Sequence, residues 1–277
     1  MKKIALYFFL IGSSLWCIYP FIWMFFSSFK TNREIYQPTT LMPTSYEWKA
    51  YENLFAGESL SFLQFFTNSL LLSSGQAILA TMLSVGTAFV LAKFRLKGGT
   101  LILGLAILLI LIPKQTLAVP MFEWMNWLGW QGSLWSLLLP GAITGLGVVF
   151  FLQLFRNFPN EWIELARIEG LSPMKTLLLL LPLVSPGLVT FFILHFVLSW
   201  QEHLLPLLLL DDESITLPLA ITKLQDSSYR IPLSVTMAAA TLSILPMLLA
   251  FGIFFGKMKT AKMTDSIIDF VKRHRRC

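Results

Sequence analysis

Long apolar runs separated by short polar stretches make up most of the chain. The first run covers residues 4–26 and the second residues 62–92, and each is long enough for a helix to cross the roughly 30 Å hydrocarbon core of a bilayer. Four more runs follow at residues 101–122, 134–155, 186–210 and 232–256. The pattern predicts an all-α, polytopic bundle of six transmembrane helices.

The third run and the segment after it contain helix-breaking and aromatic residues. Pro113 and Pro120 interrupt the run, with Lys114 between them, and lipid would leave backbone groups unsatisfied at such a break. We therefore expect a broken helix that faces protein or water. Residues 123–133 contain tryptophans three positions apart, which is typical of a short helix at the headgroup level. A nucleic-acid stacking platform would need interleaved basic residues, which this segment lacks.

Composition excludes a soluble domain. Of the 277 residues, 56% are hydrophobic and only 13% are charged, whereas soluble proteins carry about 25% charged residues. The first apolar run is too long for the core of a signal peptide and has no small-x-small cleavage site. The two cysteines, Cys17 and Cys277, have no metal-ligand spacing. The chain is therefore predicted to be a multi-pass membrane protein.

The basic residues indicate how the spans are oriented. With both termini in the cytoplasm, 15 of the 21 lysines and arginines lie on the inner side and the other 6 lie outside. Such an excess inside is the usual rule for membrane proteins. It places the polar segment at about residues 156–182 in the cytoplasm, and it assigns the net charge of +6 to membrane orientation.

That cytoplasmic segment has the signals of two helices joined by a sharp turn. Asn160 is a good N-cap residue, and Glu164 lies in the first turn, where the helix dipole favours a carboxylate. Gly170 is suited to end this helix in a left-handed conformation. Ser172 followed by Pro173 then restarts a helix. A compact charged element of this kind is suited to docking a soluble partner.

The same segment resembles the EAA coupling loop of ABC importer permeases, in particular the smaller permease subunit of maltose-like, carbohydrate-uptake systems. The matching motifs are Glu164-Leu165-Ala166, Glu169-Gly170, Leu181-Pro182-Leu183 and Pro186. Further matches are Ser28-Phe29-Lys30, Asn68-Ser69, residues 88–95, Ile112-Pro113, Val119-Pro120 and Leu217-Pro218. The resemblance implies a type I ABC permease fold.

In the resembled family this loop sits in a cleft of the ATPase subunit, where its glutamate pairs with a basic residue. Leu165 replaces the usual second alanine and Glu169 replaces the usual aspartate, which roughly keeps size or charge. We carry the docking role over to Glu164 and Gly170 above all. The implied ATPase-coupling set is Glu164, Leu165, Ala166, Glu169, Gly170 and Ser172.

A second candidate site lies in the fifth apolar run. His195, Ser199, Glu202 and His203 lie at helical offsets of four, seven and eight, which predicts one shared face. Ionisable groups at membrane depth usually face a cavity or a partner, so we expect this face to line the solute path; the alternative is that the groups satisfy one another at a helix contact. The substrate-path candidates are His195, Ser199, Trp200, Gln201, Glu202 and His203. In the resembled family, residues 200–203 are Trp-Asn-Glu-Phe, so the particular sugar stays open.

The sequence has no motif for covalent chemistry. Residues 255–258 lack the leading glycine and the hydroxyl residue of a phosphate-binding loop, and Glu202-His203 has no second histidine at zinc-protease spacing. We therefore expect no catalytic residue, no bound metal and no cofactor in this chain. ATP and magnesium would be used by partner ATPase subunits.

The resemblance thus implies a permease subunit of an ATP-driven importer for a sugar or oligosaccharide, located in a bacterial inner membrane. Its expected partners are a second homologous permease, two ATPase subunits, an external solute-binding protein and membrane lipid, but no nucleic acid. Residues 1–61 would form the first span and an external loop, residues 62–256 the five-span core, and residues 257–277 a basic tail against the ATPases or anionic lipid. Alternatives are a permease for glycerol phosphate or another small solute, an ion-coupled carrier, or a membrane-embedded enzyme.

Overall fold

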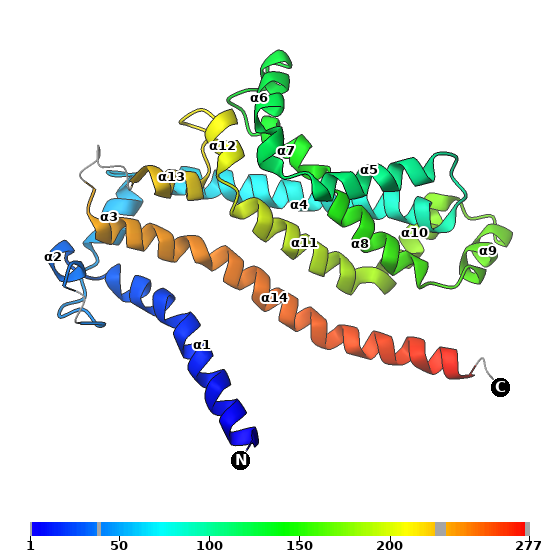
Figure 1. Cartoon of the computed structure of the whole chain (residues 1–277), viewed down its shortest axis with the longest axis horizontal. Helices are drawn as coiled ribbons and strands as arrows, with labels where there is room; N and C mark the ends of the chain where they lie inside the picture. Colours follow the sequence, from blue (N-terminus) through cyan, green and yellow to red (C-terminus); the bar gives the residue numbers. More distant parts are fainter. Residues whose placement is uncertain (1, 38–39, 225–230, 275–277) are drawn as a thin grey trace. The chain divides into compact units, whose positions relative to one another are not determined.

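The structure is a computed structural model that describes residues 2–37, 40–224 and 231–274. Beyond residue 253 it describes only the backbone, so the expected contacts of the basic tail lie outside the described side chains. Within the described residues every element is a helix, apart from one isolated parallel bridge between Gly132 and Leu210 (Figure 1). The all-α prediction is confirmed.

Five helical segments are long and apolar enough to cross a membrane, and a bent helix pair raises the number to six. The five are α1 (Lys2–Ser27), α4 (Phe62–Lys93), α7 with α8 (Trp135–Ala142, Gly145–Arg156), α10 with η2 and α11 (Pro173–Leu180, Leu181–Val184, Ser185–Trp200), and α14 (Leu233–His274). None of the residues in the most apolar stretch of α1 is buried among the described residues.

The bent pair is the broken third helix that the sequence predicts. It consists of α5 (Gly99–Leu111), η1 (Lys114–Leu117) and α6 (Ala118–Trp127), and the helix direction bends by 100° at the break. Ile112 is extended, with φ −80° and ψ 118°. The residue before a proline is disfavoured in the helical region, so Pro113 accounts for the break. The helix that carries Trp124 and Trp127 begins at Ala118, earlier than the expected residue 123.

The fifth span begins and ends earlier than the sequence predicts. The apolar helical series runs over Pro173–Trp200 rather than residues 186–210. A separate short helix, α12 (Leu204–Leu209), follows it. The physical reason is Pro206, which has no N–H for the Glu202 carbonyl and whose ring would clash with it in a continuous helix.

The chain divides into two compact units. The first comprises residues up to Asn68 together with Ile215–Met247. It holds α1, α2 (Asn32–Ile35), α3 (Lys49–Ala56), α13 (Leu217–Leu224) and the first part of α14. Buried Phe29 contacts the rings of Trp48 and Tyr51, whose hydroxyl is 2.7 Å from Ser28 Oγ. Burial raises the pKa of Tyr51. The polar segment after the first span is therefore folded.

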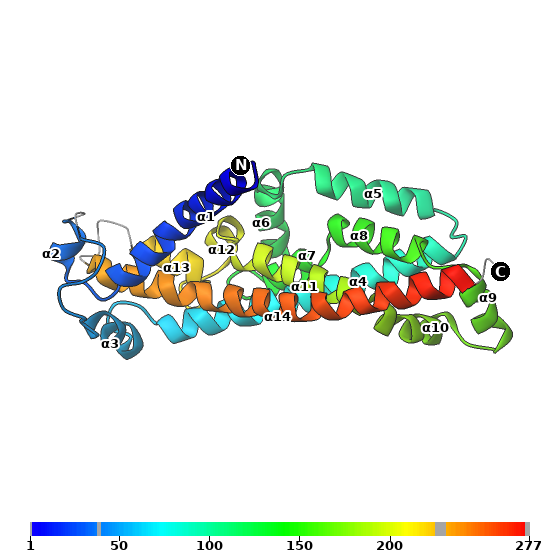
Figure 2. The ribbon, with the colours of Figure 1, turned by 90° about the horizontal axis from the view of Figure 1, so that it is seen from below.

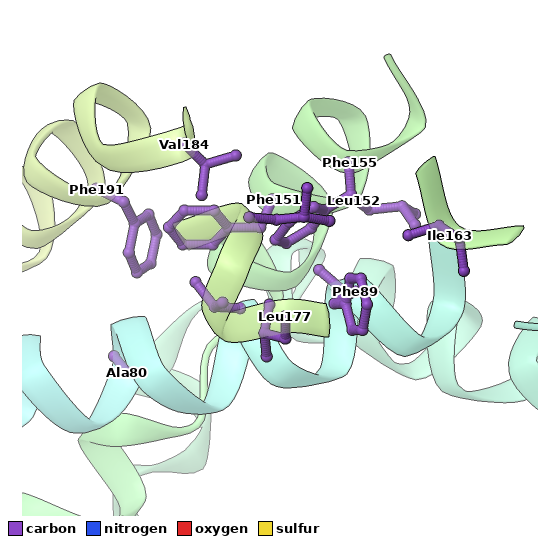
Figure 3. Packing of buried hydrophobic residues seen from close by; sticks show 12 residues of the cluster. Ala80, Phe89, Phe151, Leu152, Phe155, Ile163, Leu177, Val184 and Phe191 are labelled. Atoms are coloured by element: carbon purple, nitrogen blue, oxygen red, sulfur yellow. The ribbon is translucent and has the colours of Figure 1, made fainter. Parts of the chain in front are cut away.

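The second unit comprises Ser69–Ser214 and the chain from Leu248 onward. Its core contains Phe89 of α4, Phe151 and Phe155 of α8, and Phe191 of α11, all of them buried (Figure 3). α5 lies along α8 (Figures 1 and 2). The C-terminal end of α14 lies at the same end of this unit as α9 (Glu161–Ile168) and α10.

Two glycines at the start of α8 allow this close packing. A Cβ atom at Gly145 would overlap the Ala106 carbonyl of α5, and one at Gly147 would overlap Ser84 of α4 and Phe191. Because the Ala106 carbonyl belongs to backbone, a larger side chain at position 145 forces whole helices apart.

We expect Gly145→Ala to destabilise the protein by about 1–3 kcal/mol, the usual cost of overpacking. The matched control is Gly104→Ala on α5, where no atom lies within 4 Å of a new Cβ and where alanine should be neutral or favourable by about 0.5–1 kcal/mol. Thermal unfolding of the detergent-purified variants measures both effects. Equal melting temperatures for the two variants would contradict the proposed packing.

Candidate docking loop and buried polar cluster

The loop between α8 and α10 is a short helix that ends in a tight left-handed turn. After α9, Gly170 has φ +74°. Its N–H donates to the Arg167 carbonyl at 3.0 Å, and the Leu171 N–H donates to the Ala166 carbonyl at 2.9 Å. This pair of bonds is the Schellman motif, which favours glycine at the left-handed position. The predicted role of Gly170 in ending the helix is confirmed.

The restart of the helix follows the prediction, but the start of α9 does not. The Ser172 side chain accepts a hydrogen bond from the Lys175 N–H at 3.4 Å, and Pro173 occupies the first turn of α10. Asn160 precedes α9 but makes no side-chain capping bond. Its Oδ1 atom instead accepts a hydrogen bond from Lys93 Nζ at 3.0 Å. The prediction that the Asn160 side chain caps α9 was therefore wrong: the Asn160 backbone is helical, with φ −70° and ψ −23°, whereas a capping side chain needs an extended backbone.

The loop presents an apolar and charged surface. Ile163 and Leu177 are buried and attach α9 and α10 to the core of the second unit. On the outside, Leu165, Ile168 and Met174 are 56%, 79% and 66% exposed. Also exposed are Glu164, Glu169, Gly170 and Ser172, whereas Ala166 is half-buried. Apolar side chains grouped with charges on a surface are typical of a protein-binding site.

A buried polar cluster lies where the fourth span is broken. α7 contains Pro140 and ends at Ala142, and the next two residues are extended before α8 begins. His195 of α11 is buried, stacks on Phe191, and places Nε2 3.0 Å from the Gly141 carbonyl oxygen. Since a carbonyl only accepts, this ring nitrogen is the donor. Gln76 of α4 donates to the Leu137 carbonyl at 2.7 Å.

The four residues predicted to share one helix face, His195, Ser199, Glu202 and His203, do not all lie on one helix. α11 ends at Trp200, with Gln201 as its C-cap, so Glu202 and His203 lie beyond the helix. His195, Ser199 and Trp200 are buried, Glu202 is half-buried, and Gln201 and His203 are exposed. Glu202 Oε1 accepts a hydrogen bond from the Leu204 N–H at 3.1 Å, at the start of α12. The prediction of a single polar face was wrong because the helix stops before Pro206.

Comparison with known proteins identifies the family. Residues 80–259 match the family model described as "Binding-protein-dependent transport system inner membrane component". The chain belongs to this family. The matched residues include the docking loop, the broken fourth span and both helices that flank residues 201–203. Its members are non-catalytic, multi-pass permease subunits of ABC importers, which work with ATPase and substrate-binding partners.

Individual relatives of the family cover nearly the whole chain. The sulfoquinovosyl glycerol transport system permease protein SmoH of Agrobacterium fabrum is 32% identical over 86% of this chain and 84% of the relative. The trehalose/maltose transport system permease protein MalG of Thermococcus litoralis is 28% identical over 92% of each chain. A crystal structure of a bacterial ABC transporter involved in alginate import shares the fold, with a TM-score of 0.81 at 19% identity over 91% of this chain and 94% of that one.

Sequence reasoning missed two polar residues that make long-range hydrogen bonds in the structure. Gln76 is a lone amide in the middle of an apolar span, and polar groups at that depth usually have a specific partner. Lys93 was counted only as a cytoplasmic charge, although its position at the end of α4 places it within reach of the docking loop. Depth in the membrane could have identified Gln76, whereas no local signal identifies the partner of Lys93.

We expect His195→Leu to destabilise the permease by about 1–3 kcal/mol, because it leaves the half-buried Gly141 carbonyl without its side-chain donor. His195→Gln keeps a donor and should lose less. His203→Leu is the matched control, since it makes the same change at an exposed position. Thermal unfolding in detergent compares the three variants. If His195→Leu melts at the same temperature as His203→Leu, the hydrogen bond from His195 to the Gly141 carbonyl does not contribute to stability.

Proposed function

We propose that this permease is one of two related subunits that form the membrane path of an ATP-driven importer for a sugar or oligosaccharide. Two ATPase subunits would bind in the cytoplasm, and an external solute-binding protein would deliver the solute. The observation that carries the proposal is the docking loop within a family match over residues 80–259. The relatives' names support a carbohydrate, since they include transport systems for sulfoquinovosyl glycerol, trehalose/maltose and arabinooligosaccharides.

The orientation proposed for the chain has both termini and the docking loop in the cytoplasm. The excess of lysine and arginine supports it, with 15 of 21 on the proposed inner side. The position of α9 at the same end of the second unit as the C-terminal end of α14 is consistent with this (Figures 1 and 2).

In the proposed mechanism the chain contributes movement and binding, not catalysis. ATP and magnesium are used in the partner ATPases, whose closure displaces α9 and α10. The Schellman turn at Gly170 and the capped start of α10 at Ser172 keep the two helices at a fixed angle. Displacement of the loop is therefore passed to the fifth span, because α10 continues through η2 into α11.

The break between α11 and α12 is the proposed solute-contact region. Gln201 and His203 are exposed there and Glu202 is half-buried, so amide, imidazole and carboxylate groups are available to a hydroxyl-rich solute. His195, Ser199 and Trp200 lie buried on the preceding helix and would support this region from behind. The proposal thus divides the six candidates into three contact residues and three supporting residues.

For docking, we expect Glu164→Lys and Gly170→Ile to reduce recovery of the ATPase subunits with the permease and to lower solute uptake. The first change reverses an exposed charge, and the second forces a β-branched residue into a left-handed turn with φ +74°. Glu123→Lys, an exposed charge reversal on α6, serves as the control. Wild-type recovery and uptake in both loop variants would contradict the docking role.

For the solute path, single cysteines at positions 201 and 203 should react with a membrane-impermeant thiol reagent, and solute should protect them. Cysteines at 195 and 199 should react slowly, because both side chains are at least nine-tenths buried. The background lacks Cys17 and Cys277, and labelling is measured with and without ATP. Rapid labelling at 195 and 199 with none at 201 and 203 would reverse the assignment.

A further inference from the structure

Lys93 joins the cytoplasmic end of α4 to the start of the docking loop. It is the last residue of α4. Its Nζ atom donates hydrogen bonds to the Phe158 carbonyl at 2.6 Å and to Asn160 Oδ1 at 3.0 Å. These acceptors lie 65 and 67 residues further along the chain. One side chain therefore connects two segments that are far apart in sequence.

The groups that Lys93 engages are those that fix the direction of the chain between α8 and α9. The Phe158 carbonyl precedes Pro159, which has no N–H, and Asn160 is the last residue before α9. Asparagine at this position ordinarily caps its own helix. Here its side-chain oxygen is directed to Lys93 instead. The local capping bond has been replaced by a long-range one.

This arrangement does not serve the stability of α9 itself. A cation close to a helix N-terminus opposes the helix dipole, which favours negative charge there. Glu161, in the first turn, interacts electrostatically with Lys93 and offsets the repulsion. Because neither the dipole nor a capping bond explains the lysine, its contribution is to hold α4 and the loop in one relative position.

Aromatic contacts accompany the hydrogen bonds. Phe89 of α4 lies 5.4 Å from Phe155 of α8 between ring centroids. Phe155 is followed by Phe158 at 6.4 Å and then by Trp162 of α9 at 5.6 Å. Figure 3 shows Ile163 beside Phe155 and Phe89. These apolar contacts keep α9 on the bundle but are non-directional. The two Lys93 bonds add the directional constraint.

We propose that Lys93 is a positioning residue that transmits displacement of the docking loop to α4. The inference rests on the proposed function, in which ATPase subunits bind this loop. ATPase closure would then move two spans: α11 through the continuous path from α10, and α4 through Lys93. Loss of the lysine should leave ATPase binding intact but weaken the link between hydrolysis and transport.

The test uses the complete transporter, with both permeases, the ATPases and the binding protein reconstituted in liposomes. Lys93→Met removes the donors while keeping an unbranched side chain, and Lys93→Arg keeps donors. Lys97→Met is the matched control, because Lys97 is an exposed cation in the same cytoplasmic turn. We expect the Lys93→Met permease to co-purify with as much ATPase as the wild type does. The variant transporter should hydrolyse roughly three- to tenfold more ATP per solute imported. Lys93→Arg should stay within about twofold of the wild type.

A double-variant comparison shows whether Lys93 acts through Asn160. If it does, Asn160→Ala should add little to the defect of Lys93→Met, because both changes remove the same bond. An ATP-per-solute ratio for Lys93→Met equal to that of Lys97→Met would overturn the inference. Failure of the proposed function gives a different result from failure of this inference. In that case the wild-type permease would co-purify with no ATPase, and Glu164→Lys would have no effect.

Discussion

A backbone carbonyl that loses its helical donor inside a membrane must find another donor, because lipid offers none. The bundle of this permease depends on that constraint at the break after α7. His195 of the fifth span supplies a side-chain donor to the Gly141 carbonyl at this break, and Gln76 of the second span donates to the Leu137 carbonyl one turn earlier. One irregular stretch of the fourth span thereby fixes the packing of three, with glycine at 145 and 147 allowing the helices to approach.

Local features of the docking loop could be predicted from sequence, whereas its long-range contacts could not. Gly170 and Ser172 act on backbone groups within a few residues, so their identities were sufficient. Asn160 has the same local signal, but its backbone is helical and its side-chain oxygen accepts a hydrogen bond from a lysine 67 residues away. Capping preferences describe what a side chain can do nearby, and tertiary contacts decide between the options.

The end of the fifth span was predicted wrongly for a different reason. The leucine-rich residues after His203 are as apolar as the helix before Gln201, so hydropathy alone joins them into one span. Pro206 was the available signal, since it prevents a bond to the Glu202 carbonyl. The consequence for the candidate site is large, because exposed Gln201 and His203 belong to a helix break while buried His195 belongs to the bundle. Irregular backbone next to polar side chains is a usual setting for solute contact in transporters.

The exposed apolar surface of α1 has a consequence for how this protein tolerates amino-acid substitutions. None of the residues in its most apolar stretch is buried among the described residues, so the outer surface of α1 is suited to contact with lipid or another subunit. Contacts within this chain therefore restrict these positions of α1 only in hydrophobicity and helix length, and leucine, isoleucine and phenylalanine can replace one another. At Gly145 a single methyl group is already too large. We expect amino-acid substitutions between species to be frequent along α1 and rare at the start of α8, because only the latter is closely packed within this chain.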